Sequence, residues 1–159
     1  MLVVLAVDAS SASDWAHDGP LSSRLHDLIG KLRDDRLEVS AVLWQQGEAE
    51  ARAGASGEAY AADLSNLIGQ LRREGMKAPV FLARSTRCRN SGSEAIREGA
   101  ARVAMREADV FLGPDTDLIG DDQRYDGCHF NDAGLLSASI AWKDVLQAHG
   151  IASRRTRRL

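Results

Sequence analysis

Short apolar runs alternate with longer amphipathic stretches along this chain. Four runs have the length and the partly β-branched composition of strands buried on both faces of a sheet, where side chains need not alternate between apolar and polar. They cover residues 2–7, 39–44, 79–83 and 109–112. We therefore predict a strand at each of these places.

The stretches between these runs repeat apolar residues at helical spacing. In residues 21–32, and again in residues 60–71, apolar side chains fall at i, i+4, i+7, i+8 and i+11. This spacing places them on one face of a helix. Each stretch is therefore predicted to form a helix that packs on the sheet.

Local signals mark the ends of these and two further helices. Ser and Asn side chains cap helix N-termini, and Gly favours the residue after a helix. Ser56 and Gly75 bound the second helix, Ser91 and Glu94 have the capping-box spacing of a third, and Asn131 caps a fourth that ends near Gly150.

The alternation of strand and helix predicts an α/β fold, a three-layer α/β/α sandwich with a parallel sheet and helices on both faces. Ligands of such sheets bind beyond the carboxyl ends of the strands. Polar turns follow every predicted strand, in residues 8–11, 45–48, 84–87 and 113–131. We expect these turns to meet on one rim and to form the functional site.

Length and charge limit the possible organisation. A chain of 159 residues with 44% hydrophobic residues fits one domain, which we place at residues 1–150. Residues 151–159 are strongly basic and are expected to form a disordered tail. The net charge of −3 gives no global case for a nucleic acid or a membrane as partner.

Targeting signals and cysteine usage indicate the compartment. The first apolar run lacks a basic flank and is too short for a signal core, and no later segment is long enough to span a bilayer. A soluble cytoplasmic protein is the expectation. Two cysteines, Cys88 and Cys128, are too few for a disulfide scaffold, so reduced thiols are the default although the sequence leaves their pairing open.

Two polar clusters carry candidate chemistry. Asp126 precedes His129 by three residues in a loop, a spacing that lets a carboxylate orient an imidazole as a general base. Gln46 follows the second strand, where an amide donor can stabilise an oxyanion. Together they indicate acyl transfer. The alternative is that these side chains only form hydrogen bonds with the backbone of turns and loops.

The same clusters resemble a known family. Residues 44–48, Trp-Gln-Gln-Gly-Glu, look like the W-x-Q-G-E signature of the sialate O-acetylesterase and acetylxylan esterase-like carbohydrate esterases, a branch of the SGNH hydrolases. Residues 126–130, Asp-Gly-Cys-His-Phe, look like their D-G-x-H block. The resemblance covers residues 1–150 and implies a flavodoxin-like SGNH hydrolase fold.

The resemblance also implies roles for individual residues. By analogy His129 is the general base and Asp126 its orienting acid, while Gln46 donates to the oxyanion with Gly47 and Glu48 supporting the site. The implied reaction removes O-acetyl groups from a sugar or glycan through an acyl-enzyme, without a metal or another cofactor.

The chain departs from the family pattern at the nucleophile. Family members carry their serine in a G-Q-S-N block on an earlier strand, and no such block is present in this sequence. Three explanations stay open. The sequence lacks the first strand because it is truncated, it is a degenerate homologue without activity, or Ser10 or Ser11 acts as a substitute nucleophile.

These departures predict weak or no esterase activity for the chain as written. The main alternative is a glycan-binding or protein-interacting pseudoenzyme that keeps the pocket and not the reaction. A cation site is a further alternative, built from the acidic residues of one loop, Asp115, Asp117, Asp121, Asp122 and Asp126. Their spacing matches no EF-hand, so turn and solvent roles are the simpler interpretation.

Overall fold

The computed structural model describes residues 1–89 and 91–151 of the chain. The tail predicted to be disordered lies, from residue 152 onward, outside the described residues. Within the described part, three parallel strands form one sheet in the order β1-β2-β3. They are β1 (Val42–Trp44), β2 (Val80–Arg84) and β3 (Val110–Asp115), so three of the predicted strands are confirmed.

The central strand β2 forms the middle of the sheet and of the core. Val80 pairs with Val42 of β1 on one side and with Val110 of β3 on the other. Val80, Phe81 and Leu82 are all buried. Burial on both faces explains why this run is continuously apolar in the sequence.

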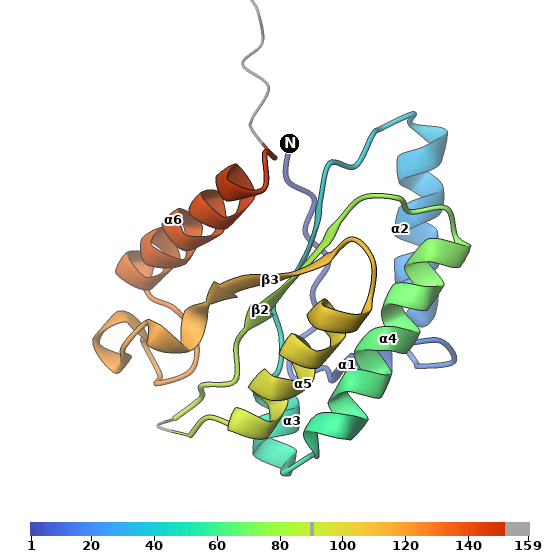
Figure 1. Ribbon diagram of the computed structural model, residues 1–159. Helices are drawn as coiled ribbons and strands as arrows, with labels where there is room; N and C mark the ends of the chain where they lie inside the picture. The colour runs from blue at the N-terminus through green and yellow to red at the C-terminus, as the bar shows by residue number, and fades with distance from the viewer. Residues whose placement is uncertain (90, 152–159) are drawn as a thin grey trace, which may run out of the picture.

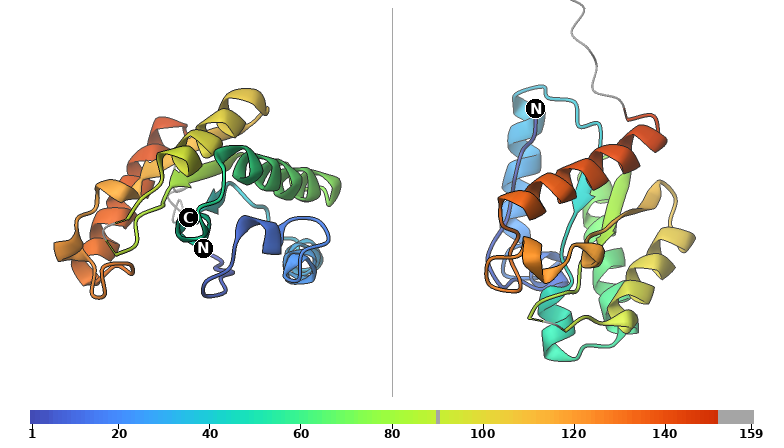
Figure 2. Two further views of the ribbon diagram at one scale, coloured as in Figure 1. Left: turned by 90° about the horizontal axis from the view of Figure 1, so that it is seen from below. Right: turned by 90° about the vertical axis from the view of Figure 1, so that its left-hand side faces the viewer.

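Helices cover both faces of the sheet. In Figures 1 and 2, α4 and α5 lie on one side of the strands and α6 lies on the other, which confirms the three-layer α/β/α arrangement. The helices are α1 (Ala12–Trp15), α2 (Ser22–Asp34), α3 (Glu48–Ala53), α4 (Gly57–Arg73), α5 (Glu94–Arg106) and α6 (Asp132–Ala148), with 3-10 turns η1 (Thr116–Leu118) and η2 (Asp121–Gln123).

Two predicted helix caps are confirmed and one is wrong. The Ser56 hydroxyl accepts a hydrogen bond from Ala59 N–H at 3.1 Å, and the Asn131 side chain accepts one from Gly134 N–H at 3.0 Å. The third helix is capped by Ser93, not by Ser91. Ser91 pairs instead with Cys88 in an antiparallel bridge, which holds it away from the helix end.

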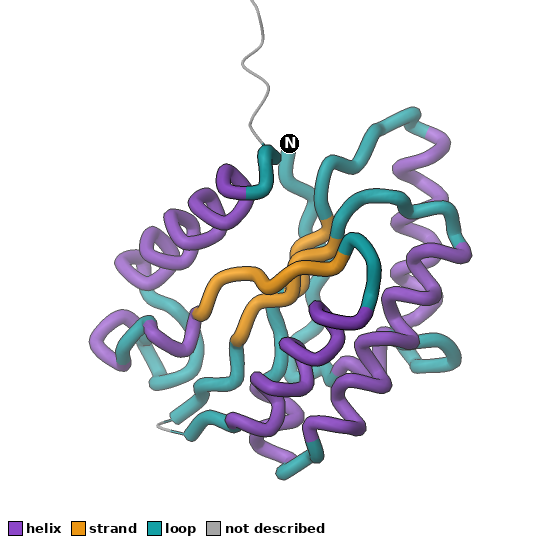
Figure 3. The backbone as a smooth tube through the Cα atoms, in the orientation of Figure 1, coloured by secondary structure: helices purple, strands orange, loops and turns teal. Residues whose placement is uncertain are grey.

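The strand predicted at residues 2–7 is wrong. This segment is loop throughout, as Figure 3 shows. A strand needs a neighbour for its backbone groups, but a cavity of about 1320 Å³ lies between these residues and β1, and both line it. Apolar content alone therefore does not make this segment a strand. Leu2 and Val4 are each 75% exposed.

Candidate active site

One cavity brings together three of the four polar turns predicted to form the site, and residues 84–87 do not line it. We call this space of about 1320 Å³ the sheet groove; its walls include residues 1–10 and residues 38–46. Ser10, Gln46 and Glu48 line it together with His129, which comes from the loop after β3. Turns separated by more than 80 residues in the sequence therefore face the same space, at the carboxyl end of β1.

Asp126 and His129 form a hydrogen-bonded pair. His129 Nδ1 lies 2.7 Å from Asp126 Oδ2, while Asp126 Oδ1 accepts the backbone N–H of His129 at 2.7 Å and that of Cys128 at 2.9 Å. These bonds, with the His129 backbone N–H first among them, hold the pKa of Asp126 well below its ordinary value. The carboxylate is thus charged and fixes the ring through Nδ1, which leaves Nε2 free for chemistry.

A buried arginine holds the loop that carries this pair. The Arg124 guanidinium donates to the backbone carbonyls of Ile119 at 3.2 Å, Thr116 at 2.9 Å and Cys128. It also lies 4.5 Å from the centre of the Phe130 ring. The sequence did not predict the role of Arg124, because the local sequence does not distinguish a buried arginine from a solvent-exposed one.

Tyr125 lies against the candidate base. Its ring stacks on the His129 ring at 5.5 Å between centres with 15° between the planes. Tyr125 itself is 70% exposed. The stack restricts the orientation of the imidazole while a broad aromatic surface stays open beside it.

Cys88 and Cys128 form a disulfide, which corrects the expectation of reduced thiols. The bond joins the loop after β2 to the residue next to His129. A hydrogen bond of 2.7 Å from Arg89 N–H to the Gly127 carbonyl reinforces the same connection. The sequence did not predict this disulfide, because the two cysteines lie in adjacent loops but are 40 positions apart in the chain.

Gln46 is held by a buried glutamate that sequence reasoning also missed. Its Nε2 donates to Glu50 Oε2 and to the Ser10 carbonyl, the latter at 3.2 Å. Glu50 also accepts the backbone N–H of Ala12 at 2.6 Å. An amide nitrogen has two protons, and both are used by these partners. Gln46 Oε1 is buried and has no hydrogen-bond partner among the described residues.

Gly47 and Glu48 shape the turn between β1 and α3. Gly47 has φ of +150°, and a Cβ there would lie 2.6 Å from the Ser85 carbonyl oxygen, so the turn requires glycine. Glu48 Oε1 accepts a 2.7 Å hydrogen bond from the Ser85 hydroxyl. Burial raises the pKa of Glu48. These two residues tie the turn after β1 to the turn after β2.

The two candidate nucleophiles have other partners. The Ser10 hydroxyl donates to the Val7 carbonyl at 2.8 Å and accepts from Trp15 Nε1 at 2.8 Å. The Ser11 hydroxyl caps α1 and contacts Asp14 Oδ2 at 2.7 Å. Within the described residues, neither hydroxyl forms a hydrogen bond with His129.

In the acidic loop at the end of β3, Asp115 and Asp117 form ion pairs with an arginine side chain of the same protein. Arg97 contacts both oxygens of Asp115, at 2.8 and 2.7 Å, and Asp117 at 3.0 Å. The bonds from Arg97 lower the pKa of Asp115. Across residues 1–89 and 91–151, no group of three or more His, Cys, Asp or Glu side chains could hold a metal ion. The structure thus gives no support to the cation site.

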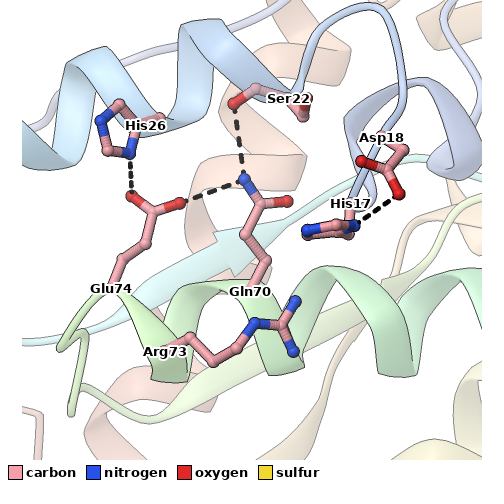
Figure 4. A pocket seen from close by; sticks show the side chains of 7 residues that line it. All are labelled: His17, Asp18, Ser22, His26, Gln70, Arg73 and Glu74. Atoms are coloured by element: carbon pink, nitrogen blue, oxygen red, sulfur yellow. Dashed lines mark hydrogen bonds and ion pairs between the residues drawn. The ribbon is translucent and has the colours of Figure 1, made fainter.

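A second, smaller pocket of about 330 Å³ lies between α2 and α4 (Figure 4). Its polar groups bind one another: His26 Nδ1 lies 3.0 Å from Glu74 Oε2, and Gln70 Nε2 donates to Glu74 Oε1 at 3.1 Å. None of the residues around it lines the sheet groove. It is therefore separate from the candidate active site.

A parallel α/β/α sheet with an acid-paired histidine and an amide at one cavity is typical of hydrolases that act by acyl transfer. The chain belongs to the carbohydrate esterase family described as sialic acid-specific acetylesterases, whose model matches residues 1–139. A sugar acetylesterase-like domain is the function class that follows from this membership. No curated protein sequence matches the chain.

Solved structures share the fold at low sequence identity. A carbohydrate esterase family 3 protein from Talaromyces cellulolyticus is 15% identical with a TM-score of 0.62, over 91% of this chain and 70% of that one. A protein from Arabidopsis thaliana is 17% identical with a TM-score of 0.67, over 87% and 56%. An acetyl esterase mutant with acetate ion is 14% identical with a TM-score of 0.60, over 91% and 70%.

At these identities the similarity concerns the fold alone. The chain spans 70% of the first of these structures and 56% of the second. Among the described residues, no helix is long and apolar enough to cross a bilayer.

Proposed function

We propose that this chain binds O-acetylated sugars in the sheet groove and that its esterase activity is weak or absent. His129 acts as the general base, oriented by Asp126, and Gln46 lies where an amide would face the developing oxyanion. The supporting observation is that His129 and Gln46 line one cavity although 83 positions separate them. Family membership supports the acetylated sugar as ligand.

The hydrogen bonds of the site support weak activity. Acyl transfer through a serine needs the hydroxyl within hydrogen-bond reach of the base. Ser10 remains a candidate nucleophile, but its hydroxyl is bound to Val7 and Trp15. Both protons of Gln46 Nε2 are likewise used by Glu50 and Ser10. Hydrolysis would require these bonds to rearrange when the substrate binds.

An aryl acetate tests the reaction directly. We expect the purified chain to hydrolyse it at a rate near the uncatalysed background, with His129→Ala and Ser10→Ala giving the same rate. A wild-type rate clearly above background would contradict weak activity. If both variants then lost that rate, Ser10 would be established as the nucleophile. Ser13→Ala is a matched control, since Ser13 precedes Asp14 on α1 and does not line the groove.

A glycan-binding protein without catalytic activity is the second candidate. The observation that favours it is the absence, within the described residues, of a hydroxyl hydrogen-bonded to His129. Calorimetric titration with an O-acetylated sialic acid separates the two functions. Saturable binding without release of acetate would identify a binding protein, and release of acetate would identify an enzyme. Binding that is equally strong for the unacetylated sugar would contradict recognition of the acetyl group.

A further inference from the structure

The disulfide between Cys88 and Cys128 is attached directly to the turn that orients the candidate base. Cys128 precedes His129, and its backbone N–H donates to Asp126 Oδ1 at 2.9 Å. The same carboxylate oxygen accepts the His129 N–H at 2.7 Å, and Asp126 Oδ2 lies 2.7 Å from His129 Nδ1. The covalent bond therefore restrains a residue that is itself a hydrogen-bond partner of the Asp126–His129 pair.

The backbone next to each cysteine is held in a constrained conformation. Arg89 follows Cys88 and has φ of +52°, and Gly127 precedes Cys128 and has φ of +78°. Arg89 N–H donates to the Gly127 carbonyl at 2.7 Å. Left-handed backbone is unfavourable for a residue with a side chain and persists only where the surrounding structure holds it. Opening the disulfide removes one of the restraints that keep Arg89 in this conformation.

The first part of the same loop is anchored without the disulfide. The Arg124 guanidinium donates to the carbonyls of Thr116 at 2.9 Å and Ile119 at 3.2 Å. It also contacts the Cys128 carbonyl, but a hydrogen bond opens and re-forms whereas a covalent bond does not. The main cluster of packed apolar residues includes neither cysteine. Opening the disulfide is therefore expected to loosen residues 126–129 while the sheet stays folded.

The two cysteines differ in their access to a reductant. Cys88 is only 3% exposed, whereas Cys128 is half-buried. Thiol–disulfide exchange proceeds by attack of a thiolate on an accessible sulfur. A dithiol therefore attacks Cys128 Sγ, forms a mixed disulfide and releases Cys88 as a thiolate that takes up a proton. The second thiol of the dithiol then closes a cyclic disulfide and releases Cys128, so that two electrons and two protons pass from the dithiol to the protein.

We propose that the Cys88–Cys128 bond is a redox switch of the Asp126–His129 pair, which a dithiol reductant opens. In the oxidised chain Cys128 is fixed, and Asp126 holds the His129 ring through Nδ1. In the reduced chain the turn is free to leave this arrangement, so Asp126 loses backbone donors and the ring is no longer held in one orientation. The effect on binding of an acetylated sugar rests on the proposed function, whereas the effect on the pair does not.

Nitrogen-15 NMR of the histidine rings tests the switch without a ligand, at a mildly alkaline pH where an ordinary imidazole is neutral. We expect the ratio of the Nδ1–H to the Nε2–H tautomer of His129 to fall about threefold or more after addition of dithiothreitol. His26 is the internal control, because its Nδ1 pairs with Glu74 in the smaller pocket, which neither cysteine lines. An unchanged His129 ratio would overturn the proposal. Equal changes at both rings would indicate general unfolding and would overturn a local switch.

A variant without the bond separates its loss from other effects of the reductant. We expect the protein with both Cys88→Ser and Cys128→Ser to show the His129 tautomer ratio of the reduced wild type, with or without dithiothreitol. A ratio equal to that of the oxidised wild type would overturn the proposal. Alkylation followed by mass spectrometry measures reduction of the folded wild type, and a bond that resists dithiothreitol in the folded protein would also overturn it.

Sugar binding by the two redox states distinguishes this inference from the proposed function. Calorimetric titration with an O-acetylated sialic acid is expected to give about threefold weaker binding, or less, to the reduced than to the oxidised protein. Equal affinity in the two states would overturn control of the sugar site by the bond. The absence of binding in both states would overturn the proposed function instead, and the His129 tautomer ratio would still decide the switch.

Discussion

Asp126 has an unusually complete set of hydrogen-bond donors for a carboxylate in a loop. The backbone N–H of His129 contributes most to the lowering of its pKa from 3.8, and the His129 ring follows. When the folded-state pKa lies below the unfolded value, the charged carboxylate stabilises the fold above the unfolded pKa. That stabilisation is lost as the pH falls through the folded-state pKa.

The His129 ring contributes part of this effect, which predicts a change in acid stability. We expect the free energy of unfolding to decrease as the pH falls below about 4, and to decrease less steeply in His129→Ala, where the backbone donors remain. Urea unfolding at a series of pH values measures both slopes. His17→Ala is the control, because His17 pairs with the exposed Asp18 instead. Equal slopes in wild type and His129→Ala would contradict a contribution from the ring.

Gly47 is the second residue on which the site geometry depends. A Cβ at this position would contact the Ser85 carbonyl oxygen at 2.6 Å, and its φ of +150° is unfavourable for other residues. We expect Gly47→Ala to destabilise the fold by about 1–3 kcal/mol. Gly54→Ala is the matched control, since Gly54 has φ of +67° but no atom within 4 Å of an added Cβ. Equal losses in chemical unfolding would show that the contact with Ser85 has no effect.

At the scale of elements, the helices expected from the sequence are present, whereas the strand expected at residues 2–7 is wrong. Helix patterns and caps are local, so residues 57–73 and 132–148 could be predicted from spacing and from Ser56 and Asn131. A strand depends on a neighbour that the local pattern does not contain. Residues 2–7 have strand-like composition, but they have no adjacent strand among the described residues and remain a loop.

The loop that holds Asp126 and His129 is connected to its neighbours by the disulfide and by Arg124. We expect reduction of the Cys88–Cys128 bond to lower the free energy of unfolding by about 2–4 kcal/mol, because the bond restricts the unfolded chain. Urea unfolding with and without a reductant measures this loss. The variant with both cysteines changed to serine should be insensitive to the reductant. Equal stability of the oxidised and reduced wild type would contradict a stabilising bond.

At the scale of the whole molecule, the sequence predicted which turns meet but not what holds them. Gln46 and His129 follow strands of one parallel sheet, so their convergence follows from topology. Glu50 and Arg124 are buried at 6% exposure each, and their roles depend on partners that no local pattern specifies. For the same reason the pairing of Cys88 with Cys128 was not predictable.

The central claim is that Gln46 and the Asp126–His129 pair face one sugar-binding cavity. Titration of an O-acetylated sialic acid into isotope-labelled protein, followed by NMR, tests it most directly. We predict saturable shifts of the Gln46 side-chain amide and of the His129 ring with one shared affinity, while the His26 ring in the smaller pocket stays unchanged. Shifts at His26 alone, or different affinities at Gln46 and His129, would contradict a shared site.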